Sequence, residues 1–375
     1  MKNPFVTNGY VSPEYFCDRE KETAKIVSLL MNENNIALIS PRRLGKTDLL
    51  RHCFGQPEIK EHYHSFIIDI YATSSVRDFV NVFGKAVLDE LRSKGKSVWS
   101  TFLNVLASLR SEITFDMNGQ PTWGIGLGAI TNPSATLDEI FSYLNNAGKP
   151  CLIAIDEFQQ ITKYTDDPNI EAALRTHIQR CSNAHFVFSG SHRHLMGAMF
   201  TSPARPFYQS VTLINLPPIS VDKYAEFCHK NFELAGKRLD TLVVAELYNR
   251  FNGITSYMQK VMNILFSMTG AGEICIPSMI DTAINDLLDF SADTYDALLY
   301  QMPEKQRIAF MAIAAEGKAK AISSGDFVRK YRLQSASSVS SAVKGLLEKD
   351  FITYDKGIYQ VYDQFFQLWL QRNKL

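Results

Sequence analysis

The sequence of 375 residues lacks a long apolar run. No window approaches the roughly 18 consecutive apolar residues of a membrane-spanning helix. Residues 1–16 contain no continuous apolar segment like that of a secretory signal peptide. These absences argue against a membrane partner and against secretion, so we expect a cytoplasmic protein.

The sequence also lacks an excess of charge of either sign, because Lys plus Arg and Asp plus Glu both number 39. The overall balance therefore does not indicate a nucleic-acid or membrane partner. The distribution is uneven, since residues 300–375 hold 12 basic and 7 acidic residues. The C-terminal part is mildly basic.

Metal-binding and redox spacings of cysteine are absent as well. The six cysteines contain no C-x-x-C pair, and most lie in apolar segments, which favours reduced core residues. His192 and His194 have no third ligand nearby in the sequence, which disfavours a metal site there.

What the sequence does contain is a phosphate-loop pattern, NIALISPRRLGKTDLL, at residues 35–50. An apolar strand leads into a loop that ends in Gly45-Lys46-Thr47 and opens a helix. In such loops the amides and the helix N-terminus face a polyphosphate, the Lys reaches the β and γ phosphates, and the Thr hydroxyl takes a Mg²⁺ position. The tripeptide alone would also fit a turn before an ordinary surface helix.

The usual pattern G-x-x-x-x-G-K-[ST] has Ser40 in place of its first glycine. Ser40 can hold the turn if its φ stays negative, because only Gly visits positive φ freely. We expect the nucleotide to contact the loop and the first helical residues, namely Ser40, Pro41, Arg42, Arg43, Leu44, Gly45, Lys46, Thr47 and Asp48.

A second apolar run, Cys151–Ile155, ends in Asp156 and Glu157. A parallel strand that ends in two carboxylates places them at the edge where open α/β sheets bind ligands. Asp156, with Thr47, would hold Mg²⁺, and Glu157 would orient the attacking water. The two carboxylates could instead be acidic caps of a solvated helix. Together with Gly45-Lys46-Thr47 they favour nucleotide chemistry.

Strands and helices alternate along residues 1–218, which predicts a parallel α/β sheet covered on both faces, as in P-loop NTPases. Asn118-Gly119, between two alternating runs, predicts an inserted β-hairpin near residues 110–130. The expected strands are residues 35–40, 64–73, 151–156, 184–191 and 210–216.

Residues 219–299 have helical periodicity and predict a helical lid. The last periodic segment, residues 280–302, predicts one helix that runs slightly past the end of the lid. Residues 300–375 predict three helices followed by two strands that turn at Lys356-Gly357, which is the pattern of a winged helix. The exposed face of the third helix would be small, polar and weakly charged, with Ser337, Ser338, Ser341, Lys344 and Glu348. DNA binding, protein docking and an intramolecular regulatory contact all remain open for this domain.

The chain resembles the archaeal-type P-loop ATPases of the AAA+/STAND group over nearly its whole length. The resemblance is carried by YFCDRE, SPRRLGKT, AIDEFQQI, FSGSHRHLM and YDQFFQLWL. It implies an ATPase core, a helical lid and a C-terminal winged helix, with ATP or ADP and Mg²⁺ as cofactors. Oligomerisation is possible, and the choice of adenine over guanine is likewise an implication of the resemblance.

The resemblance also implies roles for single residues. Lys46 and Thr47 match the Walker A pair, and Asp156 and Glu157 match Walker B. Ser191, or with less support Ser189, matches the sensor that lies close to the γ-phosphate. Phe16, Asp18 and Arg19 match the segment beside the base and the phosphate loop, although Arg19 could equally form an ion pair at a helix start.

Arginines are harder to assign. Arg42 or Arg43 would point toward phosphate or a partner subunit. Arg180 lies where AAA+ proteins often carry an arginine finger, with competitors at Arg175, Arg193 and Arg205, and all four could be ordinary surface residues. In the lid, Thr255 stands where STAND relatives usually carry Pro.

We expect an ATP-hydrolysing switch in which Glu157, Lys46 and Ser191 are catalytic. The alternative is a nucleotide-regulated DNA-binding or scaffold protein that hardly hydrolyses ATP. Phosphoryl transfer to a small molecule is disfavoured, because a lid and a winged helix follow the core where an acceptor-binding domain would be needed.

Overall fold

A computed structural model describes residues 2–92, 113–115, 121–123 and 132–375. The chain forms two units within them. The first comprises Asn8–Tyr224 and Ile254–Ser256, and the second comprises Met1–Thr7, Ala225–Gly253 and Tyr257–Leu375. No helix in the described ranges has both the length and the apolar character that crossing a membrane requires.

The first unit is built on a five-stranded parallel sheet with the order β2-β5-β6-β1-β7. This confirms the expected fold class. The order places β6 between β1, which leads into the phosphate loop, and β5, which ends in the two carboxylates. The strands are β1 (Ile36–Ile39), β2 (His64–Asp69), β5 (Cys151–Asp156), β6 (Ala184–Gly190) and β7 (Thr212–Asn215).

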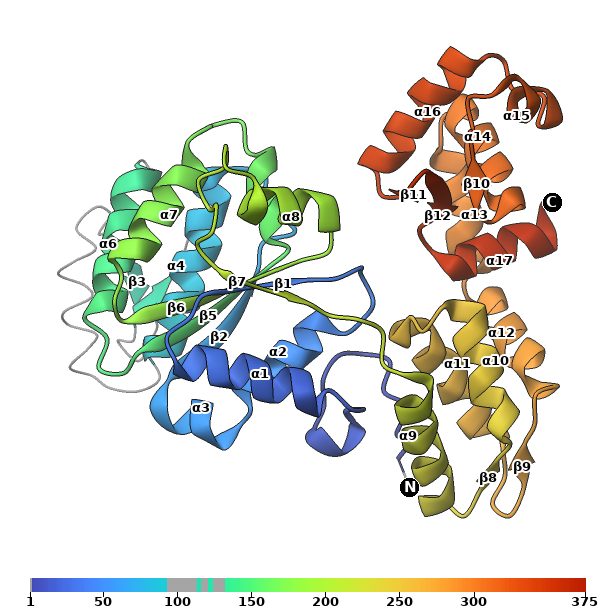
Figure 1. Ribbon diagram of the computed structural model, residues 1–375, viewed down its shortest axis with the longest axis horizontal. Coiled ribbons are helices and arrows are strands. Elements are labelled where there is room, and N and C mark those ends of the chain that lie inside the picture. The colour runs from blue at the N-terminus through green and yellow to red at the C-terminus, as the bar shows by residue number, and fades with distance from the viewer. Residues whose placement is uncertain (1, 93–112, 116–120, 124–131) are drawn as a thin grey trace. The chain divides into compact units, whose positions relative to one another are not determined.

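Helices cover both faces of this sheet. Successive residues of a strand point to opposite sides, so an apolar strand such as β5 presents apolar side chains to both faces. In β5, Ile153 and Ile155 join one apolar cluster and Leu152 and Ala154 join the other. Figure 1 shows α1, α2 and α3 along one side and α4, α6 and α7 along the other. The helical segments are η1 (Pro13–Tyr15), α1 (Glu20–Met31), α2 (Lys46–Phe54), α3 (Pro57–His62), α4 (Val76–Arg92), α6 (Pro133–Asn145), η3 (Phe158–Lys163), α7 (Ile170–Arg180) and α8 (Arg193–Thr201).

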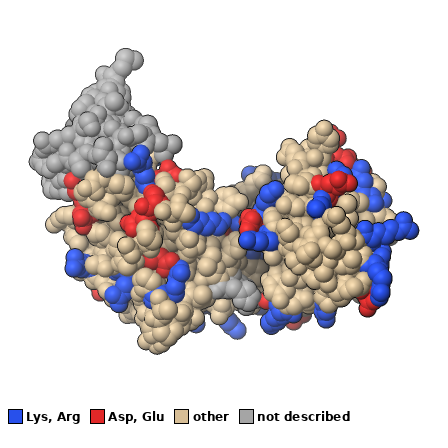
Figure 2. All heavy atoms as spheres, turned by 90° about the horizontal axis from the view of Figure 1, so that it is seen from above, with Lys and Arg blue, Asp and Glu red and all other residues tan. Residues whose placement is uncertain are grey.

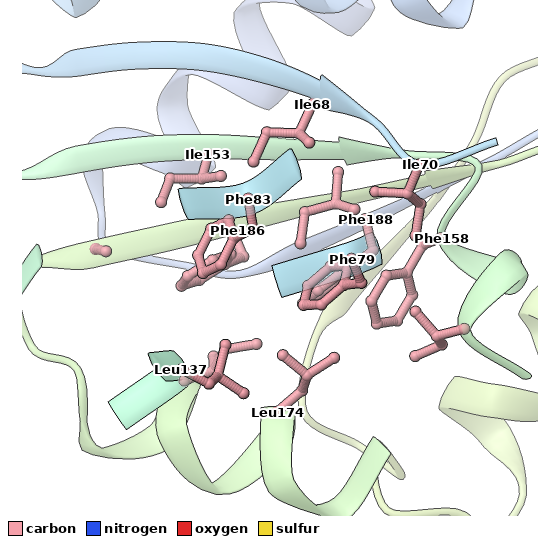
Figure 3. Packing of buried hydrophobic residues seen from close by; sticks show 14 of the residues in the cluster. Ile68, Ile70, Phe79, Phe83, Leu137, Ile153, Phe158, Leu174, Phe186 and Phe188 are labelled. Atoms are coloured by element: carbon pink, nitrogen blue, oxygen red, sulfur yellow. The ribbon is translucent and has the colours of Figure 1, made fainter. Parts of the chain in front are cut away.

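The larger apolar cluster lies between the sheet and helices α4, α6 and α7 and is rich in phenylalanine (Figure 3). Phe158, which follows the carboxylate pair, is fully buried and its ring centroid lies 4.4 Å from that of Phe188. The residues after β5 are therefore anchored in the core.

One local expectation for this unit needs adjustment, and another is met. Strand β2 ends at Asp69 rather than at residue 73, because Thr73 Oγ1 donates to Ile70 O (2.6 Å) and closes a turn. Short strands β3 (Ile113–Phe115) and β4 (Pro121–Trp123) pair antiparallel, as expected of the hairpin. The predicted turn at Asn118-Gly119 lies outside the described residues.

The second unit contains the helices of the segment expected to form a lid, together with a small parallel strand pair. The expected single helix over residues 280–302 is wrong, because the chain breaks at Ser291, whose amide bonds back to Leu288 O (3.2 Å). The change of direction lets Tyr295 stack on Phe366 with centroids 4.5 Å apart. The elements are α9 (Val221–Leu234), β8 (Arg238–Leu239), α10 (Thr241–Phe251), α11 (Thr255–Met268), β9 (Ile274–Cys275), α12 (Met279–Phe290) and α13 (Ala292–Gln301).

The winged helix is confirmed and is larger than expected. A third strand, β10, pairs with β12, and the chain closes with helix α17. Asp363 caps α17 by accepting from Phe365 N (3.0 Å), and the helix buries Phe366 and Trp369. The elements are α14 (Glu304–Glu316), β10 (Ala319–Lys320), α15 (Gly325–Lys330), α16 (Ala336–Glu348), β11 (Ile352–Asp355), β12 (Ile358–Val361) and α17 (Gln364–Asn373).

Candidate functional site

The phosphate loop joins β1 to α2. Gly45 has a φ of 81°, in the left-handed region that favours glycine, and α2 begins at the next residue. Arg43 also has a positive φ (70°), whereas Ser40 does not, so Ser40 meets the condition set by the missing glycine. Pro41 is exposed and Leu44 is buried in the apolar cluster beneath the loop.

Lys46 lies under this loop. Its side chain is 6% exposed, and Nζ donates to Ser40 O (3.2 Å) and Pro41 O (3.3 Å). Burial lowers the pKa of Lys46, and the nearby carboxylates of Glu157 and Asp156 oppose that shift. A buried ammonium held by carbonyl oxygens is a strong local positive charge beside the loop amides, which suits polyphosphate.

Thr47 and Asp156 come together across the sheet edge. Thr47 Oγ1 donates to Asp156 Oδ2 over 2.5 Å, and Asp156 Oδ1 accepts from Glu157 N (3.0 Å). A hydroxyl beside a carboxylate is an oxygen donor set suited to Mg²⁺ when part of its coordination comes from phosphates and water. These two residues therefore fit the metal expected with a nucleotide. Asp69 lies opposite Asp156 in the strand register, and burial first, then Asp156 and Glu157, raise its pKa.

Glu157 leaves the strand with a left-handed backbone (φ 55°, ψ 39°). Its Oε2 accepts two hydrogen bonds, from Gln159 Nε2 (2.5 Å) and from Ser191 Oγ (2.8 Å). Ser191 in turn accepts from Arg42 Nε (3.0 Å), and the Arg42 guanidinium lies 5.6 Å from the centroid of the Tyr71 ring. Arg42 thus joins the phosphate loop to the ends of β6 and β2.

Between the two sensor candidates, the geometry separates Ser191 from Ser189. Ser191 follows β6 and reaches Glu157. Ser189 lies inside the strand, is fully buried, and its hydroxyl has no partner among the described residues. The other loop arginine, Arg43, offers its carbonyl to Ser256 N (3.2 Å), next to Thr255 at the start of α11.

The residues expected beside the base lie near α2. Phe16 stacks on His52, with centroids 4.5 Å apart and planes 22° from parallel. Arg19 is 3% exposed and its Nη1 pairs with Glu22 (2.8 Å), while Nη2 has no partner in the described part of the chain. Arg19 therefore forms the ion pair at a helix start that was one of its two expected roles. Burial raises the pKa of Asp48, which lies 3.8 Å from Arg51.

The arginine-finger candidates lie in different environments. Arg180 is exposed at the end of α7, and Arg205 pairs with Glu171. Arg175 is half-buried, and its Nε has no partner within the described ranges. The side chain of Arg193 lies outside the described residues.

Sequence reasoning missed Gln159 and Tyr71. Gln159 is two residues beyond Glu157 and is 3% exposed, yet its sequence position gives no sign that it bonds the carboxylate. Tyr71 was expected to lie inside β2, which was predicted to run to residue 73. Its position beside Arg42, after the end of that strand, was therefore not predicted.

Two family models match this chain. Residues 16–261 match the family described as an ATPase domain predominantly from Archaea, and residues 293–372 match one described as a probable winged helix domain. No curated protein matches the sequence.

Similar solved structures cover both units. A Walker-type ATPase of Pyrococcus abyssi has a TM-score of 0.62 at 16% identity, covering 98% of this chain and 99% of its own. The ORC1 protein of Aeropyrum pernix, in complex with DNA, has a TM-score of 0.56 at 12% identity, covering 99% and 97%. The ORC2 protein of the same organism, with ADPNP and ADP, has a TM-score of 0.55 at 12% identity, covering 99% and 98%. At these identities the likeness establishes the fold.

Proposed function

The chain belongs to the family of ATPase domains found predominantly in Archaea, and from this premise we propose that it is a slow, Mg²⁺-dependent ATP-hydrolysing switch. The observation that carries the proposal is the meeting of Lys46, Thr47, Asp156 and Glu157 at one edge of the sheet, with Thr47 and Asp156 joined at 2.5 Å. Each of these groups suits one part of phosphoryl transfer to water.

Each residue of the site has its own role in the proposed hydrolysis. Lys46 and the loop amides hold the phosphates, and Thr47 with Asp156 would hold Mg²⁺, whose charge stabilises the transferring phosphoryl group when it is bound. Glu157 orients the attacking water and accepts its proton. Ser191, which contacts Glu157, senses the γ-phosphate, and the Arg42 contact with Ser191 links that position to the phosphate loop.

The switch would act through the lid and the winged helix. Ser256, in the first turn of α11, bonds the carbonyl of Arg43 in the phosphate loop (3.2 Å), so the start of a lid helix is tied to the loop itself. A movement of the loop on nucleotide exchange would therefore reach Thr255 and Ser256, the first residues of α11, which belong to the same unit as the loop. Residues 1–218, 219–299 and 300–375 would serve as core, lid and output domain.

Steady-state phosphate release from the full chain tests this proposal. We expect Glu157→Gln to lower the rate by about 100-fold or more while ATP binding is kept, because the amide cannot accept a proton. Lys46→Ala should lose nucleotide binding. Equal phosphate release by wild type and Glu157→Gln would overturn hydrolysis and favour a switch that only binds nucleotide.

A second candidate function is DNA binding by the winged helix. Ser337, Ser341 and Lys344 of α16 are exposed, so a small polar helix face is available for a groove. ORC1 of Aeropyrum pernix, a similar structure, is bound to DNA. The charges give this candidate less support, because Lys330 pairs with Glu316 (2.6 Å) and Lys344 lies 4.0 Å from Glu348.

Figure 2 shows basic side chains interrupted by acidic ones over the face it presents, rather than one broad basic surface. Duplex-DNA titration of the full chain at low and at moderate salt tests the candidate, with Lys344→Gln as the variant. DNA binding predicts an affinity that falls with salt and a weaker salt slope for the variant. Binding that is absent at both salts would overturn this candidate and leave protein docking or an intramolecular regulatory contact as the role of this domain.

A further inference from the structure

We infer that Gln159 is a positioning residue for ATP hydrolysis, which holds the Glu157 carboxylate so that one oxygen is available to the attacking water. The inference rests on the proposed hydrolysis and adds a residue to it. The evidence is the 2.5 Å bond from Gln159 Nε2 to Glu157 Oε2, together with the way each of the two residues is held.

Glu157 needs an external support. Its backbone is left-handed, which is unfavourable for a residue with a side chain, and the side chain has several rotatable bonds. A general base must be placed within hydrogen-bond reach of its water to act. A carboxylate on such a turn would sample many orientations unless neighbours fixed it.

Gln159 and Ser191 supply that support at the same atom. Both donate to Oε2, and no described residue donates to the other oxygen, Oε1. Because the carboxylate can only accept, the amide must present its NH₂ group to it. The arrangement fixes the plane of the carboxylate and leaves Oε1 to accept from water.

Gln159 is itself rigidly placed. It lies in η3 directly after Phe158, whose ring is fully buried against Phe188 (Figure 3). Phe207 packs edge-on against the same ring. The carbonyl of Gln159 accepts from Thr162 Oγ1 (2.8 Å). The donor therefore comes from a core-anchored segment, whereas Ser191 follows the end of β6.

The absence of a side chain at Gly190 leaves room for the side-chain amide of Gln159. A Cβ added at Gly190 would overlap Gln159 Oε1 and the Met196 side chain. Gln159 Oε1 is buried without a partner in the described part of the chain. An amide that leaves one end unsatisfied in order to bond a carboxylate with the other is better explained by the carboxylate than by packing.

The adjacent residue provides a matched control. Gln160 is on the same short helix, and its Nε2 donates to the backbone carbonyl of Thr73 (2.9 Å) instead of to Glu157. Gln160→Leu removes the same chemical group from the same helix without touching the base. Comparison of the two variants separates support of Glu157 from support of η3.

The test measures kcat, KM, nucleotide affinity and melting temperature for Gln159→Leu and Gln160→Leu, each made in wild type and in Glu157→Gln. For Gln159→Leu we expect kcat to fall about 10- to 100-fold while nucleotide affinity changes less than about twofold. In the Glu157→Gln background the same change should have no further effect beyond about twofold, because the group it positions is gone. Gln160→Leu should keep kcat near the wild-type value.

Three results would overturn the inference. The first is an equal kcat for Gln159→Leu and Gln160→Leu. The second is that Gln159→Leu lowers kcat in the Glu157→Gln background as much as it does in wild type. The third is that Gln159→Leu lowers nucleotide affinity alone and leaves kcat unchanged. If Gln159→Leu is too unstable to assay, Gln159→Asn keeps the amide but shortens its reach, and should lower kcat with affinity kept. Failure of the hydrolysis proposal is distinguishable, because wild type and Glu157→Gln would then release phosphate equally; without that reaction the inference falls too.

Discussion

The Thr47 hydroxyl donates a hydrogen bond to Asp156 Oδ2 over 2.5 Å, which joins the start of α2 to the end of β5. Strand β1, which leads into the loop before α2, is not a neighbour of β5 in the sheet, because β6 lies between them. The bond is therefore a tertiary contact that depends on the loop, the strand order and the carboxylate together. It gives a direct test of the proposed metal site.

Thr47→Val should weaken Mg²⁺-dependent nucleotide binding by about tenfold or more, because valine keeps the shape of threonine and removes the oxygen. The unfolding free energy of the nucleotide-free protein should fall by about 1–2 kcal/mol, since Asp156 loses a donor. Nucleotide titrations with Mg²⁺ and with a chelator measure the effect. Thr47→Ser is the control and should behave like wild type, whereas Mg²⁺-dependent binding by the valine variant at wild-type strength would contradict the site.

Lys46→Met should abolish nucleotide-induced stabilisation without lowering the melting temperature of the nucleotide-free protein. Burial lowers the pKa of Lys46, so the folded state holds its proton less tightly than the unfolded state. The burial cost of the charge is therefore relieved as the pH rises through the lowered pKa toward the ordinary value of 10.5, and stability increases in that window.

Methionine removes both the charge and this pH dependence. Thermal unfolding at neutral and alkaline pH, with and without ATP and Mg²⁺, measures both effects. A variant that is still stabilised by ATP as strongly as wild type would show that Lys46 does not hold phosphate.

The predictable residues of the site are those that lie in local sequence patterns. Lys46, Thr47, Asp156 and Glu157 lie within local patterns, and parallel strands bring their carboxyl ends to one edge. Gln159 has no such pattern, because its bond depends on the left-handed turn at Glu157 and on the short helix after it. Tertiary geometry of this kind is not encoded in a residue spacing.

The secondary-structure elements that were not predicted also fall into two groups, those with a local sequence signal and those that depend on tertiary contacts. Helix α17 had a local signal that was overlooked, namely the capping Asp363 before buried Phe366 and Trp369. Strand β10 has only two residues and depends on pairing with β12, so no periodicity could reveal it. The break at Ser291 lies inside a continuous helical pattern and is explained by packing of Tyr295 on Phe366.

Ser40→Gly should leave nucleotide affinity within about threefold of wild type. Ser40 already has a negative φ, and it accepts the hydrogen bond of Lys46 Nζ through its backbone carbonyl, which glycine also has. Gly45→Ala should instead lower affinity and cost about 1 kcal/mol of stability, because alanine is strained at a φ of 81°. Apart from the residues next to it in the chain and the backbone of its own helix, no described residue has a heavy atom within 4 Å of a Cβ built at Gly45, so the cost is one of backbone conformation. Nucleotide titration and chemical denaturation of the two variants provide the comparison, and equal behaviour would contradict the assigned loop geometry.

His52→Phe should reduce the loss of stability that acid causes between about pH 7 and pH 5. Burial lowers the pKa of His52 below its ordinary value of 6.5, and its ring packs on Phe16 and bonds the Tyr10 hydroxyl through Nδ1 (3.0 Å). Below that ordinary value the unfolded chain takes up a proton that the folded chain resists, so stability falls as the pH falls.

Phenylalanine can keep the stacking but cannot titrate, so the variant's stability should depend less on pH even if the lost Tyr10 bond lowers it at pH 7. Burial also lowers the pKa of His177 and His185, so part of the wild-type slope should remain. Denaturant midpoints across the range, with His185→Gln as a comparison outside the Phe16 contact, test this. Because Phe16 is a candidate neighbour of the base, nucleotide affinity should weaken in acid in wild type and less so in His52→Phe; parallel pH curves for the two proteins would separate His52 from the nucleotide site.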